Sequence, residues 1–225
     1  MGSTAYGGAP YDAVRDFSPI TATHMSPNVV TAHPSLPVKS VKDLLALAKS
    51  KPGQLNYASS ASGAASHLAG ELFKFMGGVN IVRIPYRGAG IAINDMISGQ
   101  VELAFYTATT VMPHVRAGRL RALAVTSAQP FTLIPELPTV AASGIPGYES
   151  ASTYGLFAPA KTPDAIINRL NQEVVQMLQA AATKEKFAGL GSEIVAGPPA
   201  ALGTLIKAET TRLGKVIKHA GIRPD

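Results

Sequence analysis

The sequence predicts an α/β fold with a mainly parallel sheet covered by helices, and two observations lead to this. First, a short apolar run, a loop of small residues and an amphipathic run recur three times within residues 55–126. The amphipathic runs are long enough to be the crossover helices that parallel strands require. Second, 46% of the residues are hydrophobic and 15% are charged, which is typical of a packed globular core.

The repeated block supplies the predicted sheet and its helices, and a fourth apolar run closes it. We expect strands at 55–58, 81–86, 101–106 and 120–127, and helices at 67–77, 91–99 and 111–118. Ligands of such sheets bind beyond the carboxyl ends of the strands, against helix N-termini. The loop at 59–66, SSASGAAS, lies at a position of that kind.

Two extended runs bounded by prolines flank the block, at 27–37 and 152–160. Before the first of them, residues 11–20 predict a turn that leads into a strand. Ser40 predicts a helix start. The apolar face of that helix consists of Val41, Leu44, Leu45 and Ala48.

The C-terminal part is expected to hold two helices and a short strand. Thr162-Pro163-Asp164 predicts a long helix, with Thr162 as N-cap and Pro163 at the first helical position. A short strand is expected within 191–197 and a last helix at about 199–219. The first of these helices has one apolar face, made of Ile166, Ile167, Leu170, Val174, Met177 and Leu178.

The chain is expected to cross twice between two lobes. Residues 33–150 form the second lobe, a complete α/β ligand-binding domain, inserted between residues 1–32 and 151–225 of the first lobe. Two crossings make a hinge, and a ligand cleft between the lobes follows from it.

Composition excludes several classes of function. Without cysteine there is no disulfide, thiolate metal site or Cys nucleophile. Four of the five histidines, His24, His33, His114 and His219, are isolated, so we expect neither a metal nor a cofactor. The net charge of +6 indicates either a solvated basic surface or a field that favours anionic small molecules. Lys and Arg are scattered, which argues against nucleic acid. No apolar run is long enough to span a membrane, and residues 1–30 show no signal peptide.

The serine-rich stretch 58–67 is the strongest candidate site. Its hydroxyl and backbone N–H groups precede a helix, where orphan donors and the helix dipole favour a carboxylate or a phosphate. Its small residues let a ligand approach the backbone closely. The alternative is an ordinary capped helix start. The candidate ligand-binding residues of this stretch are Ser59, Ser60, Ala61, Ser62, Gly63, Ser66 and His67. Tyr106, Thr107 and Thr109, at or after the end of a later strand, are further candidates, and core packing explains the tyrosine about as well as ligand contact.

An enzyme acting on small carboxylates is the runner-up, with Ser60 or Ser66 as nucleophile and His67 as base. No G-x-S-x-G elbow occurs in the chain and no orienting acid is visible, which favours binding without catalysis. Residues 88–93 nearly match the dinucleotide fingerprint, but Ile93 replaces its third glycine. A remnant that binds no ligand is the third possibility.

Several motifs, in their order along the chain, resemble those of Bug-type receptors, the substrate-binding proteins of tripartite tricarboxylate transporters. They include HPSLPVKSVKDLLALAKS (33–50), PYRG (85–88), ISGQVELAF (97–105), PELPTVAASGIPGYE (135–149) and YGLFAPAKTP (154–163). The resemblance implies a periplasmic, non-catalytic receptor with the two-lobed, type II periplasmic binding protein fold. Such receptors capture a small carboxylate, often a di- or tricarboxylate or an acidic amino acid, and hand it to membrane permease subunits.

The resemblance also implies a site. In the family, one carboxylate is bound by the loop and helix start that correspond to 59–67 and by the loop that corresponds to 106–109. Tyr106 stands where many members have an Asp, so a plain carboxylate is expected rather than an amino acid. Ala61 stands where many have Gly, and it lacks freedom at positive φ. Tyr154, near the second crossing, is a further expected contact.

Compared with the family, the chain is expected to be N-terminally truncated. MGST resembles the end of a first-lobe strand, and the stretch before residue 10 looks shortened. The signal peptide, the first βα units and a Pro/Gly-rich loop that grips the ligand would be missing. We therefore expect exposed apolar faces on the two C-terminal helices, with self-association or weak ligand binding.

Overall fold

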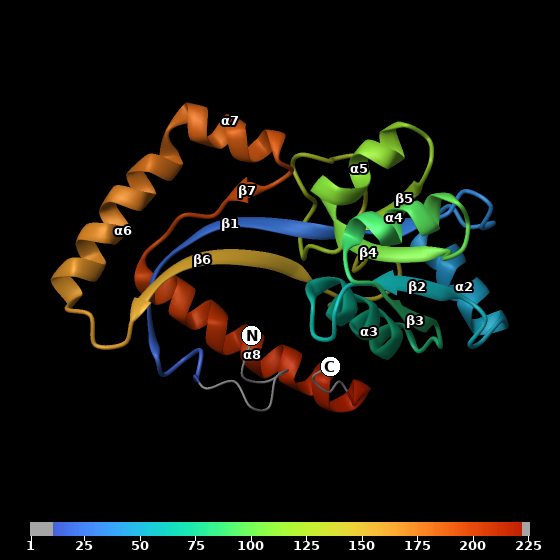
Figure 1. Ribbon diagram of the computed structural model, residues 1–225, viewed down its shortest axis with the longest axis horizontal. Coiled ribbons are helices and arrows are strands. Elements are labelled where there is room, and N and C mark those ends of the chain that lie inside the picture. Colours follow the sequence, from blue (N-terminus) through green and yellow to red (C-terminus); the bar gives the residue numbers. More distant parts are fainter. Residues whose placement is uncertain (1–10, 222–225) are drawn as a thin grey trace. The chain divides into compact units, whose positions relative to one another are not determined.

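The computed structural model describes residues 11–221, the side chains of residues 219 and 220 excepted. Its residues fall into two compact units, one made of 11–26 and 152–221 and the other of 27–151 (Figure 1). The expected strand end at MGST and the shortened stretch after it lie outside the described residues. The expected division into lobes, with residues 33–150 as the second lobe, stays a prediction.

The 27–151 unit holds a sheet with the strand order β3-β2-β4-β1-β5. The strands are β1 (Phe17–Ala32), β2 (Asn56–Ser59), β3 (Val82–Pro85), β4 (Leu103–Thr107) and β5 (Arg121–Val125). Strand β2 is parallel to both β3 and β4, as expected. Strand β1 is antiparallel to β4 and β5, so the sheet is mixed. The repeats could not reveal this, because only strands joined by a crossover helix must be parallel, and β1 precedes them all.

The 27–151 unit also holds four helices, and each has an apolar face that it buries. They are α2 (Val41–Ser50), α3 (Ala65–Gly77), α4 (Ala89–Ile97) and α5 (Ala108–Arg116). As predicted, Ser40 caps α2, its hydroxyl accepting the Asp43 N–H at 3.1 Å. Val41, Leu44 and Ala48 are buried.

The sheet has a different core on each face. On the α3 face, Phe105 of β4 meets Phe73 and Tyr57, with ring centroids 5.4 and 5.7 Å apart. Gly70 of α3 lies against the Tyr57 ring so closely that a Cβ there would be 2.3 Å from Cε2. On the other face, Tyr106 packs with buried residues of α4 and α5. Alternation along β4 therefore sends Phe105 and Tyr106 into separate cores.

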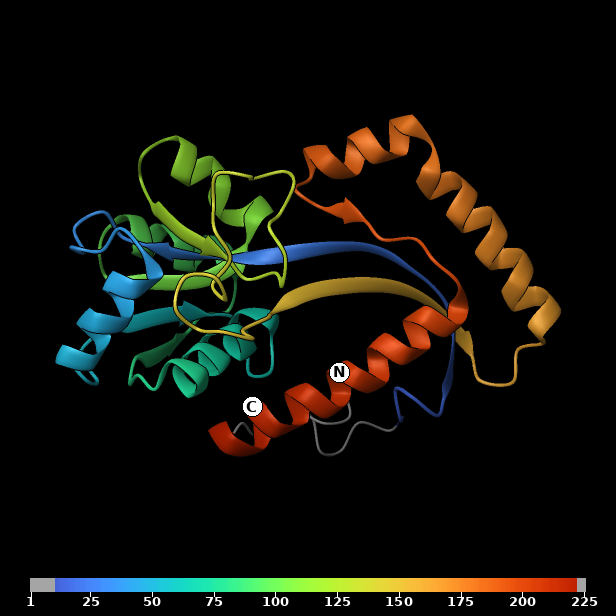
Figure 2. The ribbon, with the colours of Figure 1, turned by 180° about the vertical axis from the view of Figure 1, so that it is seen from behind.

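In the other unit, the beginning of β1 pairs with β6 (Ala151–Pro159) and β7 (Glu193–Ile194) (Figure 2). Its helices are α6 (Asp164–Gln179), α7 (Ala181–Gly189) and α8 (Pro199–Ala220). The Asn171 amide ties α6 to this sheet by donating to the carbonyls of Ile20, at 2.9 Å, and Gly197, at 2.8 Å.

Two sequence-based expectations need correction here, and one helix was missed. The extended run expected at 27–37 belongs to a strand that starts at Phe17 and ends at Ala32. Helix α6 begins at Asp164 with Pro163 at the N-cap position, and the Thr162 hydroxyl donates to the Pro159 carbonyl instead of capping the helix. Helix α7 was not predicted, because it has no clear apolar face and none of its residues is buried.

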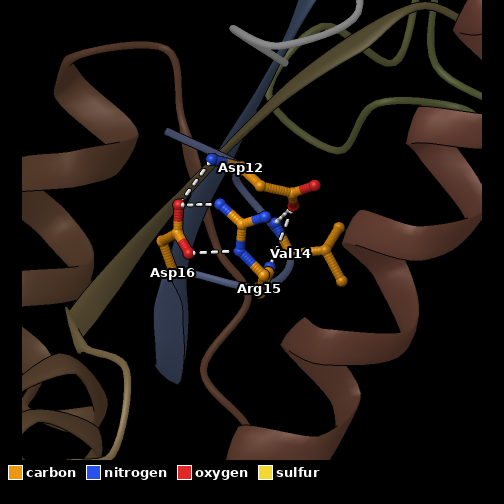
Figure 3. A network of polar contacts seen from close by, with 4 residues as sticks. All are labelled: Asp12, Val14, Arg15 and Asp16. Carbon is orange, nitrogen blue, oxygen red and sulfur yellow. Dashed lines mark hydrogen bonds and ion pairs between the residues drawn. The ribbon is translucent and has the colours of Figure 1, made fainter. Parts of the chain in front are cut away.

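A network of polar contacts precedes β1 (Figure 3). The Asp12 carboxylate accepts the backbone N–H groups of Val14 and Arg15, which makes the expected turn. The Arg15 guanidinium donates two hydrogen bonds to the Asp16 carboxylate, at 2.6 and 2.9 Å. Those bonds, with the Asp12 N–H, lower the pKa of Asp16 to about 2.

Candidate functional site

Three helix N-termini share one edge of the 27–151 sheet. Because β3, β2 and β4 are parallel, their carboxyl ends lie at the same edge, and α4, α3 and α5 are the helices that follow them in the chain (Figure 1). Within residues 11–221, none of the three has a side-chain cap, as is also true of α6, α7 and α8, whereas α2 has one. The first N–H groups of a helix have no acceptor in the helix and carry partial positive charge. This edge is therefore suited to an anion.

The loop before α3 is held by its own polar groups. The Ser60 N–H donates to the Ser66 hydroxyl at 3.0 Å, and the Gly63 N–H donates to Nδ1 of His67 at 3.1 Å. His67 thus accepts at Nδ1, so its neutral ring carries the proton on Nε2. The positive φ of the loop falls on Gly63, at +74°, and not on Ala61. The alanine therefore costs the loop no backbone strain.

A cation that the sequence argument did not select braces this loop. Arg83 of β3 donates from Nε to the Ser59 hydroxyl at 2.7 Å and from Nη2 to the Ser60 carbonyl at 2.9 Å. A third bond, from Nη1 to the Ser62 hydroxyl, is 3.3 Å long. The parallel register sets Arg83 beside Tyr57, two residues before Ser59. The only sequence signal was a lone charge inside the apolar run IVRIPY.

The second candidate segment, at the start of α5, brings hydroxyl groups together. The Thr107 hydroxyl lies 2.9 Å from the hydroxyls of both Thr109 and Thr110. Tyr106 is 4% exposed, and its hydroxyl has no hydrogen-bond partner within the described residues. Burial raises the pKa of Tyr106. Strands β2 and β4 are neighbours, so this segment and the serine loop lie at the same edge of the sheet.

The remaining candidate contact is Tyr154, which belongs to the 152–221 part of the other unit. Its ring stacks on that of His24 at 4.3 Å. Its role in ligand binding stays a prediction.

The geometry gives little support to the alternative, an enzyme with a serine nucleophile and His67 as base. Ser66 and His67 are consecutive in α3, so their side chains do not face each other. The acid one turn further on, Glu71, accepts from the Tyr57 hydroxyl at 2.7 Å and from Lys74 at 2.8 Å. Among the described residues, no three His, Asp or Glu side chains gather in a way that could hold a metal ion.

Comparison with known proteins gives a consistent picture. The profile of the tripartite tricarboxylate transporter family receptor matches residues 3–222. A protein encoded in the tcbD–tcbE intergenic region of Pseudomonas sp. strain P51 is 35% identical over 94% of this chain and 63% of its own length. Protein BugT of Bordetella pertussis is 32% identical over 99% of this chain and 68% of its own length. The chain thus spans less than two thirds of the Pseudomonas relative.

Solved structures agree with these relatives. The R. palustris protein Rpa4515, solved with adipate, is 36% identical, with a TM-score of 0.86 over 100% of this chain and 77% of its own. The periplasmic binding protein BugD is 30% identical, with a TM-score of 0.82 over 99% of this chain and 76% of its own. The described α/β fold is therefore the fold of periplasmic binding proteins.

Proposed function

Because this chain belongs to the tripartite tricarboxylate transporter receptor family, we propose that it is a periplasmic receptor for a small dicarboxylate. It hands this ligand to the membrane permease subunits of the transporter and catalyses no reaction. The observation that carries the proposal is the set of three uncapped helix N-termini along one sheet edge. The relative solved with adipate indicates the ligand class. No helix within residues 11–221 has the length and apolarity needed to cross a membrane.

The proposed site has two parts with different tasks. The backbone at the start of α3, with the hydroxyls of Ser60 and Ser66, receives one carboxylate, and the start of α5 shapes the rest of the pocket. Arg83 contributes positive charge and keeps the serine loop in its binding shape. The full set of proposed ligand-binding residues is Ser59, Ser60, Ala61, Ser62, Gly63, Ser66, His67, Tyr106, Thr107, Thr109 and Tyr154.

A calorimetric panel tests this function. Adipate, succinate, L-malate and citrate are titrated into the chain, together with adipamide, which has the same carbon skeleton as adipate but no charge. At least one carboxylate should bind and adipamide should not, because the helix N-termini select negative charge. If no carboxylate binds, or adipamide binds as well as adipate, the proposed function is wrong.

A charge placed at the helix start locates the site. Ala65 is the first residue of α3 and is exposed. Ala65→Asp puts a carboxylate where the anion is proposed to sit, which favours the helix and repels the ligand. Gln100, exposed and before β4, lies at the opposite end of that strand, so Gln100→Asp is the matched control. Adipate affinity should fall at least tenfold in the first variant and stay within twofold in the second.

Absence of catalysis is a separate part of the proposal. A serine-directed fluorophosphonate probe should label neither Ser60 nor Ser66, because Ser66 and His67 are consecutive in α3 and the Ser66 hydroxyl accepts the Ser60 N–H. Stoichiometric labelling of either serine, detected by mass spectrometry, would favour the enzyme instead.

We also propose that the chain self-associates through α6. Three apolar side chains on this helix are exposed: Ile166 at 50%, Leu170 at 40% and Met177 at 54%. A second copy of the chain would remove them from water. Sedimentation velocity should show dimers or larger species that disappear in the Leu170→Glu, Met177→Glu double variant. A compact monomer at every concentration would contradict this proposal.

A further inference from the structure

Asn28 is a buried polar residue that none of the sequence motifs singled out. It lies on β1 within the 27–151 unit and is 1% exposed. Its side-chain Nδ2 has no hydrogen-bond partner among residues 11–221. Buried amide groups in folded proteins are nearly always hydrogen-bonded, so an amide left without an acceptor is exceptional. Such a group can take a ligand oxygen as its partner.

The sheet register places this amide at the proposed ligand edge. Asn28 pairs with Thr107, the residue that precedes α5, and Val30 pairs with Phe105. Paired residues of antiparallel strands point to the same face of the sheet, and alternate residues of one strand share a face. Asn28 therefore lies on the face of Phe105, which is the face that α3 covers. The amide, the Thr107 hydroxyl and the start of α3 are on one face at one edge.

The backbone of Asn28 is fixed by a single threonine. The Thr126 N–H and hydroxyl both lie 2.9 Å from the Asn28 carbonyl. The same hydroxyl lies 2.6 Å from the Ser150 carbonyl, and the Ser150 N–H donates to the Thr126 carbonyl at 2.8 Å. Thr126 thus clamps the chain close to both ends of the 27–151 unit. A side chain on so constrained a backbone loses little freedom when it binds.

We propose that the Asn28 amide donates a hydrogen bond to an acceptor oxygen of the ligand, a carboxylate oxygen in the first place, and so helps to determine specificity. This inference rests on the proposed carboxylate-binding function. The Asn28 amide is an N–H donor, like the donors that the helix N-termini supply at the same edge. A ligand bound there would give a partner to the Asn28 Nδ2, which has none among residues 11–221.

Two variants and a control separate a ligand contact from a structural role. Asn28→Leu removes the amide at nearly constant size, and Asn28→Asp reverses its preference from acceptors to donors. The control is Asn171→Leu, because the Asn171 amide is fully engaged with two carbonyls. For each protein, the urea midpoint is measured without ligand and the Kd is measured for adipate, or for the panel member that the wild type binds most tightly.

Asn28→Leu should keep or raise the urea midpoint while its Kd rises at least tenfold, and Asn28→Asp should bind more weakly still. Asn171→Leu should lower the midpoint. If Asn28→Leu binds like the wild type, the inference fails while the proposed function stands. If its midpoint falls as far as that of Asn171→Leu, Asn28 is a structural residue and the inference also fails. A wild type that binds no carboxylate overturns both proposals.

Discussion

Replacing Arg83 by methionine is expected to lower the free energy of unfolding and to weaken ligand binding together. The guanidinium makes two short hydrogen bonds, to the Ser59 hydroxyl at 2.7 Å and the Ser60 carbonyl at 2.9 Å, and one of 3.3 Å to the Ser62 hydroxyl. Hydrogen bonds of charged groups contribute about 1.5–3 kcal/mol each. Arg83 is only partly buried, so water replaces some of these bonds. We expect a net loss of about 2–3 kcal/mol.

Binding should weaken because the loop loses its brace. Without Arg83, the loop must be ordered by the ligand, and the free-energy cost of that ordering reduces the binding free energy. A loss of about 1.4 kcal/mol corresponds to a tenfold increase in Kd. Arg83→Lys should fall between the wild type and Arg83→Met, because one ammonium group keeps the charge but cannot reproduce the planar fork.

Urea unfolding followed by circular dichroism measures the stability, and calorimetric titration with adipate measures the affinity. The matched control is Arg87→Met, which removes the same charge from an exposed position four residues away. The reasoning is refuted if Arg83→Met and Arg87→Met have the same urea midpoint. It is equally refuted if Arg83→Met loses stability but binds adipate like the wild type, because the loop shape would then be irrelevant to binding.

Three further predictions concern the scaffold. Gly70→Ala places a Cβ 2.3 Å from the Tyr57 ring and should cost about 1–3 kcal/mol of unfolding free energy in a urea titration, less in a Tyr57→Leu background. The pKa of Asp16 is lowered to about 2, chiefly by its hydrogen bonds with Arg15. Its contribution to the free energy of unfolding is therefore complete above its ordinary pKa of 3.8 and is lost as the pH falls towards 2. Asp16→Asn should make the urea midpoint less dependent on pH across that window. Ser40→Ala removes the cap of α2 and should lower the unfolding free energy by about 1 kcal/mol in the same titration, whereas Ser40→Asp should not.

The elements of the 27–151 unit could be predicted from the sequence because their signals are local. Each strand of the repeats is an apolar run, and each following helix has its own apolar face. The direction of β1 could not be predicted in this way, because its neighbours β4 and β5 lie far along the chain. A short helix without a buried residue, such as α7, has no periodic burial to reveal it.

The candidate site shows the same division between local and distant information. The serine loop could be found because small and polar residues directly precede a helix. Arg83 could not be assigned to it, because the contact depends on the parallel register of β2 with β3. Asn28 was hidden for a similar reason, since only its pairing with Thr107 brings it to the edge.

The structure also divides the serines of the loop by task, which their common chemistry does not suggest. Ser59 and Ser62 both accept hydrogen bonds from Arg83, and the Ser66 hydroxyl accepts the Ser60 N–H. The hydroxyls of Ser59, Ser62 and Ser66 therefore serve first to fix the loop. What the loop then offers to an anion is mainly backbone, at the start of α3, because those N–H groups have no acceptor in the helix. Small side chains matter in this stretch because they leave that backbone accessible.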